Sequence, residues 1–217
     1  LEMNRVIAAL HAVDHEAQGL GSFGKPGNYL ERQIGRWSKQ YRASITQPID
    51  EMDRLMEWLP AHMPDSARAD LNCIVHGDYR LDNLIFHPTE PRVLAVLDWE
   101  LSTLGHPLAD FSYHCMSWHI PPGSFRGIGG LDLAALGIPP EQEYIELYCQ
   151  RSGITTWQAL QKDRNFYLAY NMFRIAAILQ GIAKRVEDGT ASSAQAKASG
   201  AGARPMAELA WLFARRH

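Results

Sequence analysis

Two short stretches of the sequence contain residue types that could carry out chemistry. One is HGDYRLDN at 76–83, and the other is VLDWE at 96–100, in which Asp98 follows Asn83 by fifteen residues. Phosphoryl transfer needs a carboxylate to accept the proton of the attacking hydroxyl, and oxygen ligands to hold magnesium against the phosphates. Asp78 can be that carboxylate. Asn83 and Asp98 offer amide and carboxylate oxygens, which suit magnesium and do not favour zinc.

Short strands must position these side chains. Apolar runs predict three of them, at 73–75, 84–86 and 93–97. Between the last two runs, HPTEPR at 87–92 supplies two prolines and several polar residues, which are typical of a turn. We therefore expect a β-hairpin over 84–98, whose second strand ends at Asp98 and brings that residue beside Asn83.

The rest of the chain has helical patterns. Apolar residues at helical spacing predict helices over 3–14, 28–45, 50–62, 108–118, 140–152 and 155–187, and a final helix after Pro205. The segment 189–204 has few large apolar residues, which predicts either a flexible linker or an alanine-rich helix. The fold class should therefore be α+β and mainly α-helical.

Composition sets broad limits on function. The 217 residues are 46% hydrophobic and carry a formal net charge of -3, which fits one globular domain and no nucleic-acid partner. Cys73, Cys115 and Cys149 are widely spaced and form no CxxC pair, which favours a reducing, cytoplasmic compartment. Because no apolar run approaches the length of a membrane span, we also expect no membrane partner.

At HGDYRLDN and Asp98 the sequence resembles the aminoglycoside phosphotransferase and choline kinase group of protein-kinase-like enzymes. The catalytic loop of that group has the pattern HGDxxxxN. It is particularly similar to the kinase-like domains fused to acyl-CoA dehydrogenases, at HGDYRLDN, at LDWELSTLG (97–105) and at PLADF (107–111). The resemblance implies a protein-kinase-like C-terminal lobe over residues 1–217, with a small β-hairpin that carries the catalytic and metal-binding loops.

The same resemblance implies a role for each matching residue. Asp78 would be the catalytic base, and Asn83 and Asp98 would bind Mg²⁺ together with ATP. Glu100, two residues after Asp98, would assist a second ion at the cofactor site.

Three further residues would support this site. His76 resembles the loop histidine that packs beneath the metal-binding strand, and Asp110 resembles the helix-borne carboxylate that holds the catalytic-loop backbone. Arg80 lies inside the catalytic loop, where it could contact either a phosphate or the substrate.

The implied activity is transfer of the ATP γ-phosphate to a hydroxyl of a small molecule, such as a hydroxyacyl-CoA, an aminoglycoside or an amino alcohol. Trp99 and Glu100 replace the Phe and Gly of protein kinases, which argues against a protein substrate. Two alternatives stay open: a non-catalytic kinase-like module that partners an oxidoreductase such as an acyl-CoA dehydrogenase, and a metal-dependent hydrolase using Asp78, Asp98 and Glu100.

A complete kinase-like enzyme also needs a glycine-rich strand–turn–strand and a lysine paired with a helical glutamate. No such segment precedes residue 76, and the sequence begins within an apparent helix. We therefore expect a C-terminal lobe whose nucleotide-binding N-terminal lobe is absent, and expect this chain alone to bind ATP poorly and to be inactive.

Other patterns have simpler explanations. GLGSFGK at 19–25 resembles a phosphate-binding loop, but a predicted helix precedes it and Pro26 replaces the final Ser or Thr, so a turn between helices is expected. His11 and His15 lack a third metal ligand, which favours structural or surface roles. Six aromatic residues could form a box for a quaternary ammonium group, but a core role is favoured: Trp118, Tyr144, Tyr148, Trp157, Tyr167 and Tyr170.

Overall fold

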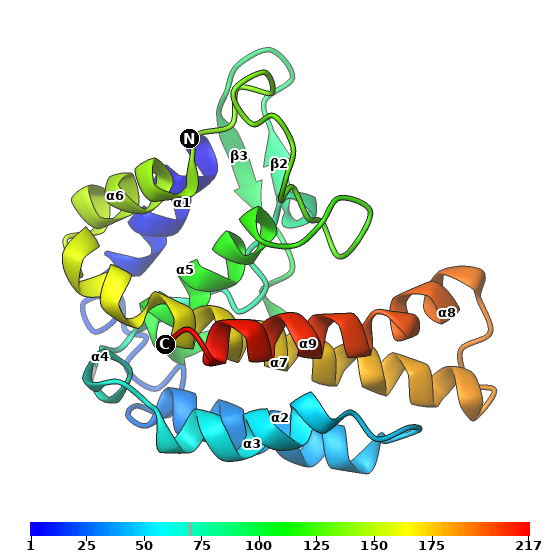
Figure 1. The fold of residues 1–217 in the computed structure, drawn as a ribbon. Helices are drawn as coiled ribbons and strands as arrows, with labels where there is room; N and C mark the ends of the chain where they lie inside the picture. The colour runs from blue at the N-terminus through cyan, green and yellow to red at the C-terminus, as the bar shows by residue number, and fades with distance from the viewer. Residues whose placement is uncertain (70) are drawn as a thin grey trace. The chain divides into compact units, whose positions relative to one another are not determined.

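The structure is a computed structural model that describes residues 1–69 and 71–217, in two compact units (Figure 1). The first unit contains Leu1–Tyr29 and Ala69–Lys162, and the second contains Leu30–Arg68 and Asp163–His217. The described residues are mainly helical and include small antiparallel sheets, so the predicted α+β fold class is confirmed. None of the helices in these ranges is both long and apolar enough to cross a membrane.

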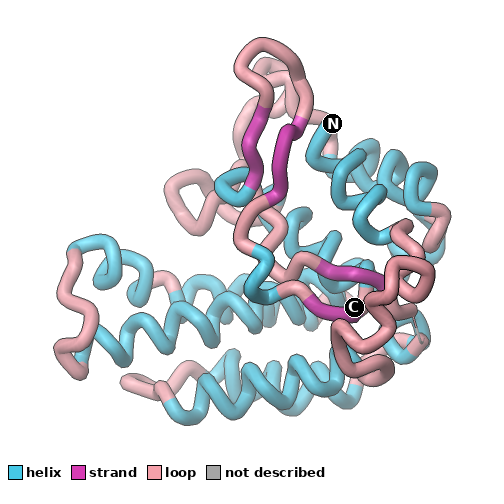
Figure 2. Tube along the Cα trace, turned by 180° about the vertical axis from the view of Figure 1, so that it is seen from behind, coloured by secondary structure: helices cyan, strands magenta, loops and turns pink. Residues whose placement is uncertain are grey.

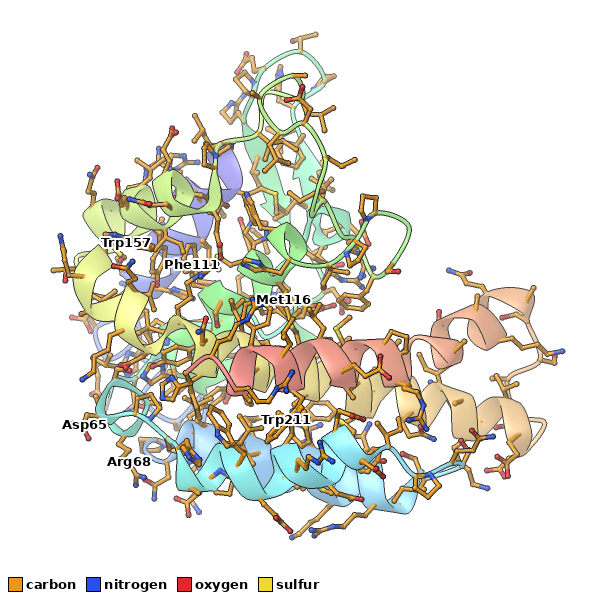
Figure 3. All side chains as sticks on the ribbon, in the orientation of Figure 1. Asp65, Arg68, Phe111, Met116, Trp157 and Trp211 are labelled. Atoms are coloured by element: carbon orange, nitrogen blue, oxygen red, sulfur yellow. The ribbon has the colours of Figure 1, made fainter. Side chains whose placement is uncertain are left out.

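The core of the first unit is built on three helices. These are α1 (Glu2–His11), α5 (Pro107–Cys115) and α6 (Glu141–Ser152). Helix α1 packs along α6, where the side-chain amide of Asn4 donates to the carbonyl of Tyr144 at 2.7 Å. The ring of Phe111, labelled in Figure 3, stacks on Tyr148 with centroids 3.7 Å apart. These buried contacts pack α1 and α5 against α6.

Two pairs of short strands, shown in magenta in Figure 2, complete the first unit. The pairs are β1 (Cys73–Val75) with β4 (Thr103–Gly105), and β2 (Leu84–Phe86) with β3 (Val93–Val96). Three 3₁₀ turns also belong to this unit: η1 (Leu81–Asn83) precedes β2, η2 (Trp99–Leu101) lies between β3 and β4, and η3 (Met116–Trp118) follows α5. Leu84 lies opposite Val96, so the predicted hairpin is confirmed, although its second strand ends at Val96 and not at Asp98.

The second unit consists of helices. They are α2 (Tyr29–Ala43) from Leu30 onward, α3 (Asp50–Ala61), α4 (Asp65–Arg68), α8 (Ala194–Ala201), α9 (Ala203–Ala214) and the part of α7 (Trp157–Glu187) that follows Lys162. Helix α3 packs along α9, and the two lie side by side in Figure 1. The apolar face predicted for the second helix is buried, with Leu30 at one end and Tyr41 near the other.

The elements differ from the prediction in a few places. Strand β4 was not expected, because its three residues TLG have no alternating pattern and become a strand only by pairing with β1. Helix α9 begins before Pro205, which lies in its first turn, where a missing N–H breaks no intrahelical hydrogen bond. Helix α8 lies within 189–204, the segment predicted as a linker or an alanine-rich helix.

Candidate active site

The backbone of the catalytic loop is held by Asp110. Its carboxylate, buried on α5, accepts hydrogen bonds from the backbone amides of His76 at 2.8 Å and Gly77 at 2.9 Å. His11 on α1 contacts the same carboxylate through Nε2 at 3.2 Å. Burial alone would raise the pKa of Asp110, but the His11 contact and the two amides outweigh it, so the pKa lies below its ordinary value.

Gly77 has a left-handed backbone conformation that residues with a side chain rarely adopt. Its φ is +83°, and a Cβ atom built there would lie 2.7 Å from the carbonyl oxygen of Leu101. The glycine of HGD is therefore required by the close approach of the catalytic loop to η2.

His76 connects the catalytic loop to the strand that leads to Asp98. Its Nε2 lies 2.9 Å from the carbonyl oxygen of Leu97, and its Nδ1 accepts the amide of Asp78 at 3.2 Å. These two contacts assign the tautomer of His76: the proton lies on Nε2, which donates to Leu97, and Nδ1 is left as the acceptor for Asp78. The ring is fully buried and 5.0 Å from that of Trp99, so the geometry supports a positioning role for His76.

Both carboxylate oxygens of Asp78 have hydrogen-bond donors. Oδ1 accepts the hydroxyl of Tyr113 at 2.6 Å, while Oδ2 accepts Nε of Arg80 at 2.7 Å and Nδ2 of Asn83 at 3.2 Å. The side chain remains 19% exposed. It can therefore be reached from solvent while its orientation is fixed from two sides.

Asn83 and Asp98 come together at the base of the hairpin. The amide of Leu97 donates to the carbonyl of Asn83 at 2.8 Å, which places Asp98 just beyond the paired strands. Asp98 has a φ of +64°, an uncommon left-handed conformation that often marks functional sites. Glu100 follows in η2 and is exposed, as Asp98 is.

The side-chain oxygen atoms of Asn83 and Asp98 are ligands of the kind that magnesium binds. The Nδ2 group of Asn83 donates to the carbonyl and carboxylate of Asp78, and no hydrogen bond within the described ranges reaches its Oδ1. Amide and carboxylate oxygens suit a cation that keeps water and phosphate ligands. Within 1–69 and 71–217 no three His, Cys, Asp or Glu side chains gather as a metal cluster.

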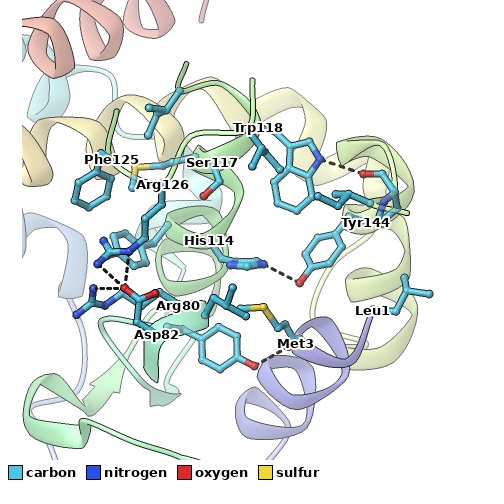
Figure 4. A pocket seen from close by; sticks show the side chains of 18 of the residues that line it. Leu1, Met3, Arg80, Asp82, His114, Ser117, Trp118, Phe125, Arg126 and Tyr144 are labelled. Atoms are coloured by element: carbon cyan, nitrogen blue, oxygen red, sulfur yellow. Dashed lines mark hydrogen bonds and ion pairs between the residues drawn. The ribbon is translucent and has the colours of Figure 1, made fainter. Parts of the chain in front are cut away.

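A pair of arginines lies beside the catalytic loop. Asp82 accepts Nη1 of Arg80 at 3.1 Å and Nε of Arg126 at 2.8 Å, both drawn in Figure 4. Because Arg80 also pairs with Asp78, the two guanidinium groups and the two carboxylates form one neutral cluster. Neither Asp82 nor Arg126 was predicted as a site residue, because nothing in the sequence shows that residues 44 positions apart meet.

An aromatic and apolar pocket of about 390 Å³ adjoins this cluster (Figure 4). Its lining includes Trp118, Tyr144, His114, Tyr113 and Arg80. The last two residues contact Asp78, so the pocket reaches the carboxylate through them. The hydroxyl of Tyr144 lies 2.9 Å from Nε2 of His114, and burial lowers the pKa of His114 to about 4.

The other predicted motifs have structural roles. Tyr148, Tyr167 and Tyr170 are buried core residues, whereas Trp118 and Tyr144 line the pocket. GLGSFGK at 19–25 lies in turns between α1 and α2, as expected. Its Gly24 packs so closely on Thr103 and Leu104 that a Cβ atom would clash with both.

Comparison with known proteins identifies the class. The model of a family described as the phosphotransferase enzyme family matches residues 2–162, and the chain belongs to this family. A Ralstonia eutropha JMP134 protein assigned as an aminoglycoside phosphotransferase is 67% identical, with a TM-score of 0.92 over 99% of this chain and 64% of that one. A macrolide 2'-phosphotransferase type I, at 18% identity and a TM-score of 0.57 over 94% of this chain and 56% of that one, shares the fold. The chain therefore has the kinase-like phosphotransferase fold.

Curated relatives are much longer proteins. Acyl-CoA dehydrogenase family member 10 of Mus musculus is 52% identical over 98% of this chain, which spans 19% of that protein. Acyl-CoA dehydrogenase family member 11 of Homo sapiens is 37% identical over 97% of this chain, which spans 26% of that protein. The chain thus spans from about a fifth to about a quarter of the length of these relatives.

Proposed function

We propose that the chain carries the catalytic loop of an ATP-dependent kinase that phosphorylates a hydroxyl of a small molecule. The observation that carries this proposal is the joint placement of Asp78, Asn83 and Asp98 at the base of one hairpin. Phosphoryl transfer requires positioning and charge stabilisation more than covalent chemistry, and this arrangement offers one carboxylate to the acceptor and two oxygen donors to a cation.

Asp78 is the proposed base. The acceptor hydroxyl would lie against its carboxylate, which takes the proton as the new O–P bond forms and the bond between the β- and γ-phosphates breaks. Arg80 and Asn83 hold Oδ2 and so keep the carboxylate in one orientation. His76 and Asp110 fix the backbone beneath it.

Asn83 and Asp98 are the proposed magnesium ligands, and Glu100 would assist a second ion. Magnesium, when bound, would neutralise charge on the phosphates. The hydrogen bonds that Asn83 donates to Asp78 orient its amide group and leave Oδ1 as the coordinating atom. The conformation of Asp98 turns the chain sharply after β3, which supports its role as the second ligand.

An apolar strand face beside these ligands suits the base of ATP. Ile85 pairs with Ala95, and side chains alternate along a strand, so Leu97 belongs to the same face. Ile85 is 45% exposed and Leu97 is 43% exposed. A planar base could cover this face, since exposed apolar groups that lie together often mark binding surfaces.

The pocket favours an acyl acceptor over a cationic one. Asp82 supplies its one carboxylate among the described lining residues, and two arginines already neutralise that group. Aminoglycosides and amino alcohols would therefore meet an apolar wall without an unpaired carboxylate. A hydroxyacyl-CoA or a related hydroxy acid fits better, and the dehydrogenase family names of the relatives support a fused or partner acyl-CoA dehydrogenase.

The test is a screen of the full-length protein for ATP consumption with hydroxyacyl-CoAs, aminoglycosides and amino alcohols. Asp78→Asn should lower turnover by roughly 10²- to 10⁴-fold, the usual contribution of a general base. The matched control is Asp188→Asn, because Asp188 is a surface residue paired with Lys184. Unchanged turnover in Asp78→Asn would refute the base assignment, and no ATP consumption with any acceptor would favour the non-catalytic module.

A further inference from the structure

Helix α5 fixes the catalytic loop at two points. Asp110 and Tyr113 are three residues apart, so both side chains lie on the same helical face. Asp110 binds the loop backbone at His76 and Gly77. Tyr113 donates its hydroxyl to Oδ1 of Asp78 at 2.6 Å, so the same helix also holds the carboxylate itself.

The hydrogen bond from Tyr113 fixes the orientation of the Oδ1 atom of Asp78. Oδ2 already accepts hydrogen bonds from Arg80 and Asn83, and the Tyr113 hydroxyl holds Oδ1 from another element of the unit. Tyr113 is only 6% exposed and lines the apolar pocket. Its hydroxyl therefore lies where the proposed acceptor pocket meets the proposed base.

We propose that Tyr113 is a positioning residue for phosphoryl transfer, whose hydroxyl orients Oδ1 of Asp78 toward the acceptor. The inference rests on the proposed function, because it assumes that Asp78 is the base. A carboxylate oxygen has two acceptor sites, so Oδ1 can keep the Tyr113 hydrogen bond while it receives the acceptor hydroxyl. Tyr113 keeps its own proton throughout, and the proton of the acceptor passes to Asp78.

The kinetic test uses the full-length protein, ATP and a hydroxyacyl-CoA that the wild-type protein phosphorylates. Tyr113→Phe removes only the hydroxyl, and kcat should fall by about 10-fold or more, as expected for a hydrogen bond to a charged group. KM for the acceptor should change by less than about threefold, because the Tyr113 hydroxyl orients the base and does not contribute to binding of the acceptor in the ground state. In an Asp78→Asn background, Tyr113→Phe should cause no further loss, because the two groups act as a unit.

Tyr41→Phe is the matched control. The hydroxyl of Tyr41, in the second unit, accepts the backbone amide of Ile49, which is not a candidate site residue, and Tyr41 is fully buried. This variant should change stability without lowering kcat. A Tyr113→Phe protein with the wild-type kcat would overturn the role of Tyr113 alone, whereas absence of turnover in the wild-type protein would overturn the proposed function.

A spectroscopic measurement tests the contact without turnover. In protein labelled with ¹³C at the tyrosine ζ carbon, the resonance lost in Tyr113→Phe identifies Tyr113. Asp78→Asn should move that resonance, because a charge-assisted hydrogen bond becomes a weaker neutral one, and should leave the Tyr41 resonance in place. A Tyr113 resonance that Asp78→Asn does not move would overturn the proposal.

Discussion

The imidazole of His11 and the carboxylate of Asp110 lie 3.2 Å apart, although 99 positions separate them in the sequence. The other ring nitrogen of His11 lies 2.7 Å from the hydroxyl of Tyr148. Helices α1, α5 and α6 therefore meet at the carboxylate that holds the amides of His76 and Gly77. The geometry of the catalytic loop depends on this buried chain of hydrogen bonds as much as on the loop itself.

Asp110→Asn should destabilise the first unit. An amide can replace one carboxylate oxygen as an acceptor, but its NH₂ group would face a backbone N–H, so at least one buried donor loses its partner. We expect a loss of about 1–3 kcal/mol in the free energy of unfolding, measured in urea. Asp188→Asn, which removes only an exposed partner of Lys184, should leave the midpoint nearly unchanged.

The acid dependence of Asp110 follows from the direction of its pKa. Because the folded-state pKa lies below the ordinary 3.8, the carboxylate stabilises the native state at all pH values above 3.8. That stabilisation decreases as the pH falls below 3.8 and is lost once the pH is below the lowered pKa. Asp110→Asn should therefore unfold with a weaker pH dependence below about pH 4 than the wild-type protein.

The residues of the candidate site could be proposed from sequence because they are close together along the chain. Asp78 and Asn83 lie in one loop of the right residue types, and the turn at 87–92 returns Asp98 to the same place. His11 and Tyr113 could not be assigned in this way, because their contacts with Asp110 and Asp78 depend on how helices pack onto the loop.

One signal for Tyr113 was present in the sequence. It follows Asp110 by three residues in a predicted helix, so both side chains had to share a face. Strand β4 had no comparable signal, because its pairing with Cys73–Val75 depends on residues about 30 positions away.

Asn83→Asp should distinguish the two proposed roles of Asn83, which are to bind magnesium through its oxygen and to orient Asp78 through its NH₂ group. The variant keeps an oxygen ligand but loses the NH₂ group that donates to Asp78, and it places two carboxylates next to each other. We expect kcat to fall and the half-saturating Mg²⁺ concentration to change by roughly 10- to 100-fold, the usual effect of disturbing the partners of a metal ligand. A magnesium titration of ATP consumption measures both.

The matched control for Asn83→Asp is Asn165→Asp. The NH₂ group of Asn165 donates to the carbonyl of Arg216, and both residues belong to the second unit. It should keep the wild-type magnesium dependence. An Asn83→Asp protein with the same dependence as Asn165→Asp would contradict the ligand role of Asn83.

His114 should make the protein sensitive to mild acid. Burial lowers its pKa from 6.5 to about 4, so between these values the unfolded chain binds a proton that the native state does not. Stability should therefore fall as the pH decreases from 6.5 to 4, by up to about 3 kcal/mol at 1.36 kcal/mol per pH unit. His114→Gln should flatten this part of the profile, and Tyr41→Phe, which leaves every histidine in place, should retain it.

Gly77→Ala should destabilise the catalytic loop, because the added methyl group would clash with Leu101. Gly19→Ala is the matched control, because it changes the backbone preference without such a clash. Both glycines have positive φ, +83° and +71°, but a Cβ at Gly19 meets nothing within 4 Å. Gly19→Ala should therefore cost only the left-handed conformation, about 1–2 kcal/mol. Gly77→Ala adds a clash with the Leu101 carbonyl, worth roughly a further 1–3 kcal/mol. Equal urea midpoints for the two variants would mean that the approach of η2 to the loop does not constrain Gly77.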